Sequence, residues 1–429
     1  MRNKLIFSIV LILLFFRADS VLAEKTAVQG APQTGTTIYL PVILRSLALP
    51  PADEAAQRIQ LPPGFAIRIY AQNITGYPRF MTVGPDGQLY ISLFGSGQIA
   101  RLPDRNADGL ADSIEIIASG LNGPHGIEFH GGYLYIASTD RVDRLPGPDV
   151  NGAFGAPEII VPEISGTGGH STRTLHFGPD GKLYVSVGSS CNVCVESDPR
   201  RAAILRFNPD GSIPTDNPFA ADADARKRPV WAYGLRNSVD FLFTPGGELW
   251  ADHNGSDGLG DSLPPEEIVI PVQKGASHGW PYCYTPTLGV NNAAEVRDTN
   301  IALPAGFTCD MAVAAKFTAP AHSAPLGMTL GSGTNFPPEY RSSLYVAFHG
   351  SWNTNIIANY RDCKVERVIL QDGQPTGSIV FAIGWRSADA KCGDAATWGR
   401  PADVIFGLNG EMFISDDKGG RVYRVIYQP

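Results

Sequence analysis

The strongest constraint on the fold is a short sequence pattern that recurs along the chain. An apolar pair, a turn containing glycine and an aromatic strand follow one another in MTVGPDGQLYIS (81–92), LHFGPDGKLYVS (175–186) and VIFGLNGEMFIS (404–415), and in three less regular copies. Every copy contains a Leu- or Met-aromatic pair, and these pairs begin at residues 89, 134, 183, 249, 344 and 412. Short strands joined by Asp-Gly or Gly-Gly turns are typical of hairpins, and such repeats are typical of propeller blades. We therefore predict an all-β fold, a six-bladed β-propeller.

The spacing between these pairs widens from 45 to 95 residues over the first five pairs and is 68 before the last. We expect the extra residues to form insertions in the later blades, which in repeat folds often collect on one face. Pairing of segment 420–427 with segment 65–71 would join the two ends of the chain. The predicted propeller domain covers residues 61–429 and follows a polar linker at 24–60. An irregular pair of β-sandwiches is the alternative architecture.

Residues 1–23 have the features of a secretory signal peptide. Arg2 and Lys4 precede an apolar run at 5–16, and Val21-Leu22-Ala23 offers a cleavage position. The apolar run is too short to cross a bilayer, although an uncleaved anchor is the alternative. No second apolar stretch approaches the length of a membrane span. We expect a secreted or periplasmic protein without a stable membrane span.

Charge and cysteine content narrow the partners and the compartment. The chain has 34 basic and 42 acidic residues, a net charge of −8, so it offers no basic surface for nucleic acid. An even number of cysteines fits an oxidising compartment. Their grouping predicts three local disulfides: Cys191–Cys194, Cys283–Cys309 and Cys363–Cys392. Zinc at Cys191 and Cys194 is the alternative, but no second ligand pair accompanies them.

Cationic and polar residues stand just before the first strand of nearly every repeat. In a propeller these positions surround the mouth of the central channel, so the residues should converge there. They are Arg79, His125, His170, Arg173, Arg236, Asn237, His322 and Arg400. A single arginine at such a position is usually solvated or ion-paired, but several around one axis predict a site for an anion or a polar ligand.

Two segments offer oxygen ligands that suit calcium. The first follows the fourth repeat and contains Asn254, Gly255, Ser256, Asp257, Asp261 and Glu266. The second, DRNADGLADSIE (104–115), matches a calcium-loop pattern through Asp104, Asn106, Asp108, Asp112 and Glu115. A solvated acidic loop and a plain Asp/Asn/Gly turn are the respective alternatives. Strand-like flanks make an EF-hand unsuitable for the second segment.

No nucleophile elbow, zinc-protease motif, phosphate loop or dinucleotide fingerprint occurs in the sequence. Histidine as a general base is the better supported chemistry, because a neutral imidazole can accept a proton near pH 7. Four histidines lie at loop-to-strand junctions: His125, His170, His322 and His349. The sequence positions alone do not show which of these four histidines is the general base.

Seven segments together resemble the quinoprotein glucose/sorbosone dehydrogenases, which are six-bladed propellers that use pyrroloquinoline quinone (PQQ) and calcium. The segments are GGHSTRTLHFGPDGKLYVSVGSSCN (168–192), YGLRN (233–237), DHNGSDGLGDSLPPEE (252–267), HGWPYCY (278–284), PAHSAPLG (320–327), HGSWN (349–353) and GRPADVIFGLNGEMFISDD (399–417). HGSWN and the Cys191/Cys194 pair resemble the sorbosone branch most.

The resemblance implies a role for each matching residue. His170 occupies the position of the general base, and Arg236 and Asn237 match the pair that faces the quinone carbonyls. Gly255 and Ser256, with Asn254 alongside, match the segment that holds the calcium bound to the cofactor. Pocket positions around the quinone match His322, His349, Trp352, Arg400 and Asp416, and Arg79 adds a further cation. The implied activity is oxidation of an aldose or a sugar aldehyde, with an unknown electron acceptor.

Three positions depart from the family pattern. Ala402 replaces a second arginine of the glucose enzymes, Thr354 replaces an arginine frequent in the sorbosone branch, and Ser189 replaces an acid that orients the base. These departures support a non-catalytic propeller that binds carbohydrate or protein as an alternative function. A calcium-dependent lactonase is a further alternative, but it would need acids where this chain has arginines and histidines.

Overall fold

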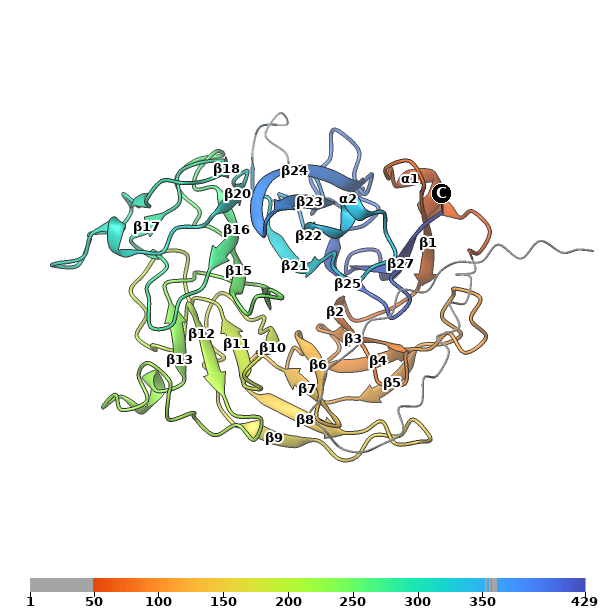
Figure 1. The fold of residues 1–429 in the computed structure, drawn as a ribbon, viewed down its shortest axis with the longest axis horizontal. Coiled ribbons are helices and arrows are strands. Elements are labelled where there is room, and N and C mark those ends of the chain that lie inside the picture. The colour runs from red at the N-terminus through yellow and green to blue at the C-terminus, as the bar shows by residue number, and fades with distance from the viewer. Residues whose placement is uncertain (1–48, 352, 355, 357–360, 429) are drawn as a thin grey trace, which may run out of the picture. The chain divides into compact units, whose positions relative to one another are not determined.

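The computed structural model describes residues 49–351, 353–354, 356 and 361–428. Within these residues, six sheets of four or five antiparallel strands form the six blades of a β-propeller. The first strands of the blades, among them β2, β6, β10, β21 and β25, lie nearest the centre in Figure 1. Neighbouring first strands contact one another, as β2 does with β6 and β25. The predicted fold is confirmed.

The blades follow one another along the chain. Blade 1 contains β2 (Pro78–Val83), β3 (Leu89–Leu93), β4 (Gln98–Leu102) and β5 (Glu115–Ala118), blade 2 contains β6 (Ile127–His130), β7 (Tyr133–Ala137), β8 (Val142–Pro146) and β9 (Glu158–Val161), and blade 3 contains β10 (Leu175–Phe177), β11 (Leu183–Val187), β12 (Ala203–Phe207) and β13 (Val230–Tyr233). Blade 4 contains β14 (Phe241–Phe243), β15 (Leu249–His253), β16 (Glu266–Pro271), β20 (Phe317–Ala319) and β18 (Gly289–Val290). Blade 5 contains β21 (Pro325–Leu330), β22 (Ser343–Phe348), β23 (Lys364–Gln371) and β24 (Gln374–Ile383), and blade 6 contains β25 (Pro401–Phe406), β26 (Met412–Asp416), β27 (Arg421–Tyr427) and β1 (Phe65–Ala71).

The remaining elements are short. They are the strand pair β17 (Cys283–Tyr284) and β19 (Val296–Arg297), the α-helices α1 (Glu54–Arg58) and α2 (Pro338–Arg341), and the 3-10 helices η1 (Ala225–Lys227) and η2 (Cys309–Met311). In the described part of the chain, no helix has the length and apolar character needed to cross a membrane.

All six Leu/Met-aromatic pairs lie in the second strand of a blade. In β3 and β11 every residue is buried, because neighbouring blades cover both faces of these strands. A strand buried on both faces needs an almost continuous apolar sequence. This requirement made the repeat recognisable.

The two ends of the described chain pair as predicted. β1 runs antiparallel to β27, with Ile67 opposite Val425, so that blade 6 combines strands from both ends. The packed domain also begins before residue 61, where the linker was expected to end. Asp53 accepts a hydrogen bond from the main chain of Ile69 at 2.6 Å, and Ala55 and Ile59 are buried in the core. The predicted signal peptide at 1–23 and most of the predicted linker lie outside the described residues.

Candidate active site

The predicted ring residues lie just before the innermost strands, but two of them are internal. His125 is fully buried, and its ring centre is 4.1 Å from that of Phe80. Burial holds the pKa of His125 well below the usual value. Arg173 is also fully buried and donates to the main-chain oxygens of His170, Thr172 and Ser165. These two residues stabilise the beginnings of the inner strands. The ligand site is therefore formed by the other predicted ring residues.

His170 is held in one orientation by Ser189. Its Nδ1 is 2.9 Å from the Ser189 hydroxyl and 3.1 Å from the Ser189 main-chain oxygen. That hydroxyl donates its own hydrogen to the Cys191 carbonyl at 2.6 Å, so it must accept one from His170. The proton therefore resides on Nδ1, and Nε2 is left with a free lone pair and no hydrogen-bond partner among the described residues. Burial, together with Arg236, lowers the pKa of His170 to about 4.

Arg236 and Asn237 lie beside this histidine. A Cβ atom on Gly188 would lie 2.5 Å from Asn237 Oδ1 and 2.6 Å from His170 Cβ, so a glycine at this position lets the two residues approach. The Arg236 guanidinium donates to the main-chain oxygens of Asn192 (3.1 Å) and Asn254 (3.1 Å). Burial lowers its pKa. The buried Arg236 cation is therefore held mainly by uncharged carbonyl oxygens.

Asn192 is a site residue that sequence reasoning missed. Its side-chain oxygen accepts from Arg236 at 2.9 Å and from the Asp257 main chain at 2.8 Å. Its side-chain nitrogen donates back to the Asp257 carbonyl at 2.8 Å. Asn192 therefore fixes both the arginine and the segment 254–257. The Cys191–Cys194 disulfide that encloses it was the available sequence signal.

The segment 254–257 runs between β15 and β16 and carries several oxygens. The Gly255 main chain donates to Glu266 at 2.7 Å, and the Asn254 main chain donates to the Asn237 carbonyl at 3.1 Å. Burial raises the pKa of Glu266. The Ser256 hydroxyl donates to Asp298 at 3.1 Å. Main-chain carbonyls with nearby carboxylates are ligands that calcium accepts.

His322 faces the same segment from blade 5. Its Nδ1 is 3.5 Å from Asp257, which raises the pKa of His322. The same pair lowers the pKa of Asp257. The Asp261 main-chain oxygen accepts from Arg361 at 3.1 Å. His322 thus closes one side of the site as part of a charged pair.

A second group joins blades 1, 5 and 6. Asp417 accepts from Arg79 and lies 2.9 Å from His349 Nε2, and Arg400 donates to the main-chain oxygens of His349 (2.9 Å) and Gly350 (3.4 Å). Burial would raise the pKa of Asp417, but His349 and Arg79 hold it below the usual range. Burial lowers the pKa of Arg400 to about 10, so this guanidinium stays charged at neutral pH.

Sequence reasoning selected Asp416 here, and the structure brings its neighbour Asp417 to the cations. The Asp416 carboxylate is fully buried and accepts from Tyr423 and from the main chains of Arg400 and Gly419. Burial raises its pKa to about 6. Trp352 lies outside the described residues.

The acidic segment 104–115 leads from β4 to β5, the last two strands of blade 1. Asp104 accepts from the main chains of Asp108 and Gly109, and the Asn106 and Asp108 side chains bond each other at 2.9 Å. The other two acids bind arginine: Asp112 accepts from the Arg105 main chain, and Glu115 accepts from Arg101 and Arg105. The loop is thus stabilised by hydrogen bonds from its own main chain and side chains, and Glu115 forms ion pairs with arginines.

The disulfides and the departures from the family pattern have clear structural outcomes. The three predicted disulfides are present, so Cys191 and Cys194 are not zinc ligands. Ala402 is fully buried and packs in an apolar cluster with Phe80, Val239 and Leu326. The Thr354 hydroxyl donates to Ser351 at 2.9 Å. Apolar packing therefore replaces a cation at residue 402.

Fold and site together define a six-bladed propeller that carries histidines and buried arginines around the starts of its inner strands. Residues 59–428 match the family model described as TrAA12-like. The chain belongs to this family.

Its relatives include named quinoprotein enzymes. An uncharacterized protein of Borreliella burgdorferi is 28% identical over 410 residues, 92% of this chain and 96% of that protein. A pyrroloquinoline quinone-dependent pyranose dehydrogenase of Coprinopsis cinerea is 24% identical over 88% of this chain and 56% of its own length. The holo structure of its PQQ domain has a TM-score of 0.69 at 21% identity, covering 86% of this chain and 97% of that one. A calcium structure of a Trichoderma reesei family AA12 enzyme has a TM-score of 0.69 at 19% identity, covering 88% and 99%. These structural similarities show the fold.

Proposed function

We propose that this protein is a secreted dehydrogenase that uses PQQ and calcium to oxidise an aldose or a sugar aldehyde. Family membership supports the reaction class. The observation in the chain that carries the proposal is His170, a neutral imidazole with a fixed tautomer next to Arg236 and Asn237. Three disulfides support an oxidising compartment. HGSWN (349–353) and the Cys191/Cys194 pair support the sorbosone-type branch within this proposal.

The donors of the site fit an anionic cofactor. PQQ is a tricarboxylate, and Arg400 is a partly buried cation whose side-chain hydrogen bonds go to neutral carbonyls. The Nε of Arg79 is buried and has no hydrogen-bond partner among the described residues. A buried donor without a partner is costly, so an acceptor from a ligand would stabilise it. Arg79, Arg236, Arg400, His322 and His349 would hold the cofactor, and the carbonyls of Gly255 and Ser256 would hold calcium, with Asn254 alongside.

The residues of the chain would divide the reaction between them. When bound, PQQ supplies a hydride acceptor and calcium a Lewis acid. His170 Nε2 would accept the proton of the substrate hydroxyl, while Ser189 keeps the other ring nitrogen protonated. Arg236 and Asn237 would stabilise negative charge that develops opposite the base. Because the pKa of His170 is about 4, the imidazole is uncharged at neutral pH and its Nε2 lone pair is available.

Cofactor retention tests this assignment directly. The purified protein is stripped with a chelator, supplied with PQQ and calcium, desalted, and assayed for bound quinone by its absorbance. We expect retention by the unaltered protein and at least tenfold weaker binding by Arg400→Ala. Arg226→Ala, an exposed arginine paired with Asp224, is the control and should bind normally. Loss of PQQ from the unaltered protein, or equal binding by Arg400→Ala, would overturn the proposal.

One observation favours a second function, a carbohydrate-binding propeller without catalysis. Ala402 puts apolar packing where a second arginine stands in the glucose enzymes. A protein that binds sugars and fails to retain PQQ would establish this alternative.

A further inference from the structure

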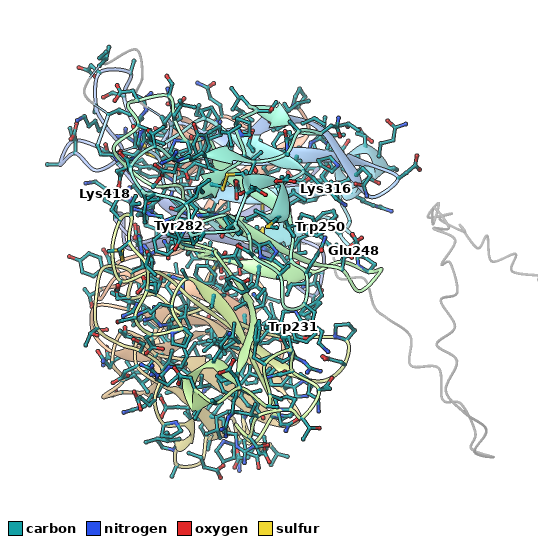
Figure 2. All side chains as sticks on the ribbon, turned by 90° about the vertical axis from the view of Figure 1, so that its left-hand side faces the viewer. Trp231, Glu248, Trp250, Tyr282, Lys316 and Lys418 are labelled. Atoms are coloured by element: carbon teal, nitrogen blue, oxygen red, sulfur yellow. A yellow bond between two sulfur atoms is a disulfide. The ribbon has the colours of Figure 1, made fainter. Side chains whose placement is uncertain are left out.

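A cavity of about 400 Å³ lies against the 191–202 segment and the insertions of blades 3 and 4. Its volume falls in the range of small-molecule sites. Aromatic side chains from four parts of the chain line it: Phe219, Tyr233, Trp280, Tyr282 and Phe307. Figure 2 looks onto this side of the propeller, where Tyr282 is labelled. The cavity is separate from the set of residues assigned above to the cofactor.

The aromatic lining is partly accessible, with Trp280 buried and Phe219, Tyr282 and Phe307 half-buried. Tyr233 is 42% exposed, and Val195, also in the lining, is 66% exposed. The rings form two pairs, Tyr282 with Phe307 at 5.7 Å and Phe219 with Tyr233 at 6.2 Å between centroids. The negative face of an aromatic ring attracts the C–H groups on the flat face of a sugar ring. Partly exposed rings in a concave site are therefore suited to stack on a pyranose.

The polar lining also requires a ligand with hydrogen-bonding groups. Arg201 lines the cavity and is only 3% exposed. Its Nε donates to Ser165, and one Nη donates to the main-chain oxygens of His170 and Gly188, each at 3.0 Å. The other Nη is buried and has no hydrogen-bond partner among the described residues. An unpaired buried donor is costly, so a ligand hydroxyl oxygen that accepts from this nitrogen would stabilise the site.

The lining carries both signs of charge. Glu196 accepts from the main chain and the hydroxyl of Ser190, at 2.5 and 2.7 Å. Lys227 lies 4.5 Å from the centre of the Phe219 ring. A carboxylate in the lining disfavours an anion, and a buried cation disfavours an entirely apolar molecule. A neutral ligand with both C–H faces and hydroxyl groups satisfies every part of the lining.

We propose that this cavity binds a carbohydrate unit other than the one that reacts at the candidate cofactor site. The choice of carbohydrate rests on the proposed function. The cavity is joined to that site by shared contacts, because the Trp280 indole donates to the Asn192 carbonyl at 3.1 Å, which also accepts from Arg236. Arg201 reaches the main chain of His170. Occupancy of the cavity therefore stabilises the segment that carries the candidate base.

The test measures sugar binding to the full chain in the absence of PQQ. Glucose, cellobiose and maltose are titrated and followed by calorimetry and by saturation-transfer NMR. We expect binding at millimolar affinity or better by the unaltered protein and at least tenfold weaker binding by the double variant Tyr233→Ala/Tyr282→Ala. Tyr133→Ala, on β7 in blade 2, should bind as the unaltered protein does. Thermal unfolding of each variant confirms that it is folded.

Several results would overturn the inference. These are no binding of any of the three sugars, equal affinity of the double variant, or uptake of a benzoquinone in place of a sugar. The outcomes separate this inference from the proposed function. Lost sugar binding with intact dye-linked oxidation refutes the cavity alone, whereas sugar binding by a protein that retains no PQQ refutes the oxidoreductase assignment alone.

Discussion

Replacing Ser189 with aspartate tests how the site sets the basicity of His170. The serine hydroxyl is 2.9 Å from Nδ1 and carries no charge. A carboxylate at a similar distance would stabilise the imidazolium, and an opposite charge this close shifts a pKa by about 1–3 units. We therefore expect Ser189→Asp to raise the pKa of His170 from about 4 to about 5–7. One unit corresponds to about 1.4 kcal/mol of added interaction with the charged form.

The assay is a histidine-selective NMR titration of the protein without cofactor, with the His170 signal assigned from His170→Gln. Ser189→Asn is the matched control, since it has the shape of aspartate without the charge and should leave the pKa near 4. Both variants lose the hydrogen bond that Ser189 donates to Cys191, so they share that structural cost. In the reconstituted enzyme, the acid limb of kcat/KM should move upward by the same amount in Ser189→Asp. The reasoning is refuted if the unaltered His170 titrates near 6.5, or if a folded Ser189→Asp protein shows no shift.

Three further outcomes follow from the geometry. Asn192→Ala should weaken binding of PQQ with calcium by about 10–100-fold in an equilibrium titration. The reason is that it removes hydrogen bonds that position both Arg236 and the 254–257 segment. Unchanged affinity would contradict this positioning role of Asn192. His176 lies between Glu128 and Asp240, at 2.9 and 3.0 Å, and although burial opposes it, these acids raise its pKa to about 10. Its stabilising effect is complete below about pH 6.5 and is lost as pH rises toward 10, so the loss of thermal stability in His176→Gln should be largest at pH 6 and should vanish near pH 10. Replacing both Cys363 and Cys392 with serine opens a loop with a sequence separation of 29, and chemical denaturation should show a loss of about 3–4 kcal/mol; a loss below about 1 kcal/mol would contradict the loop-closure argument.

The repeat was predictable because each second strand is packed between two blades. That environment demands apolar residues at successive positions, as in β3, and leaves a clear sequence pattern. Closure of the ring was also predictable, since the strand-like segments 65–71 and 420–427 stand at the two ends of the repeats and pairing them joins the ends of the chain. Which residues face the mouth of the central channel was not predictable. Adjacent residues of a strand point to opposite faces, so sequence could not decide whether Asp416 or Asp417 meets the cations.

Burial of individual cations was also beyond sequence reasoning. His125 and Arg173 share the sequence position of the other ring residues, but both are fully buried in the structure. Arg201 lies in the loop between β11 and β12 and occupies no position of the repeat. Its guanidinium nevertheless donates to the His170 carbonyl. Such contacts depend on how the loops of blades 3 and 4 pack against the propeller. No local sequence pattern predicts that packing.

The central claim is that His170 removes a proton while the bound quinone is reduced by a sugar. The most direct measurement is anaerobic mixing of the PQQ- and calcium-loaded protein with an excess of aldose, with reduction of the quinone followed by its absorbance in a single turnover. We expect reduction by the unaltered protein, and a rate lower by a factor of about 100 or more in a His170→Ala variant that still retains PQQ. Reduction at the same rate in both proteins would contradict the role of His170, and no reduction by any aldose or sugar aldehyde would contradict the assigned reaction.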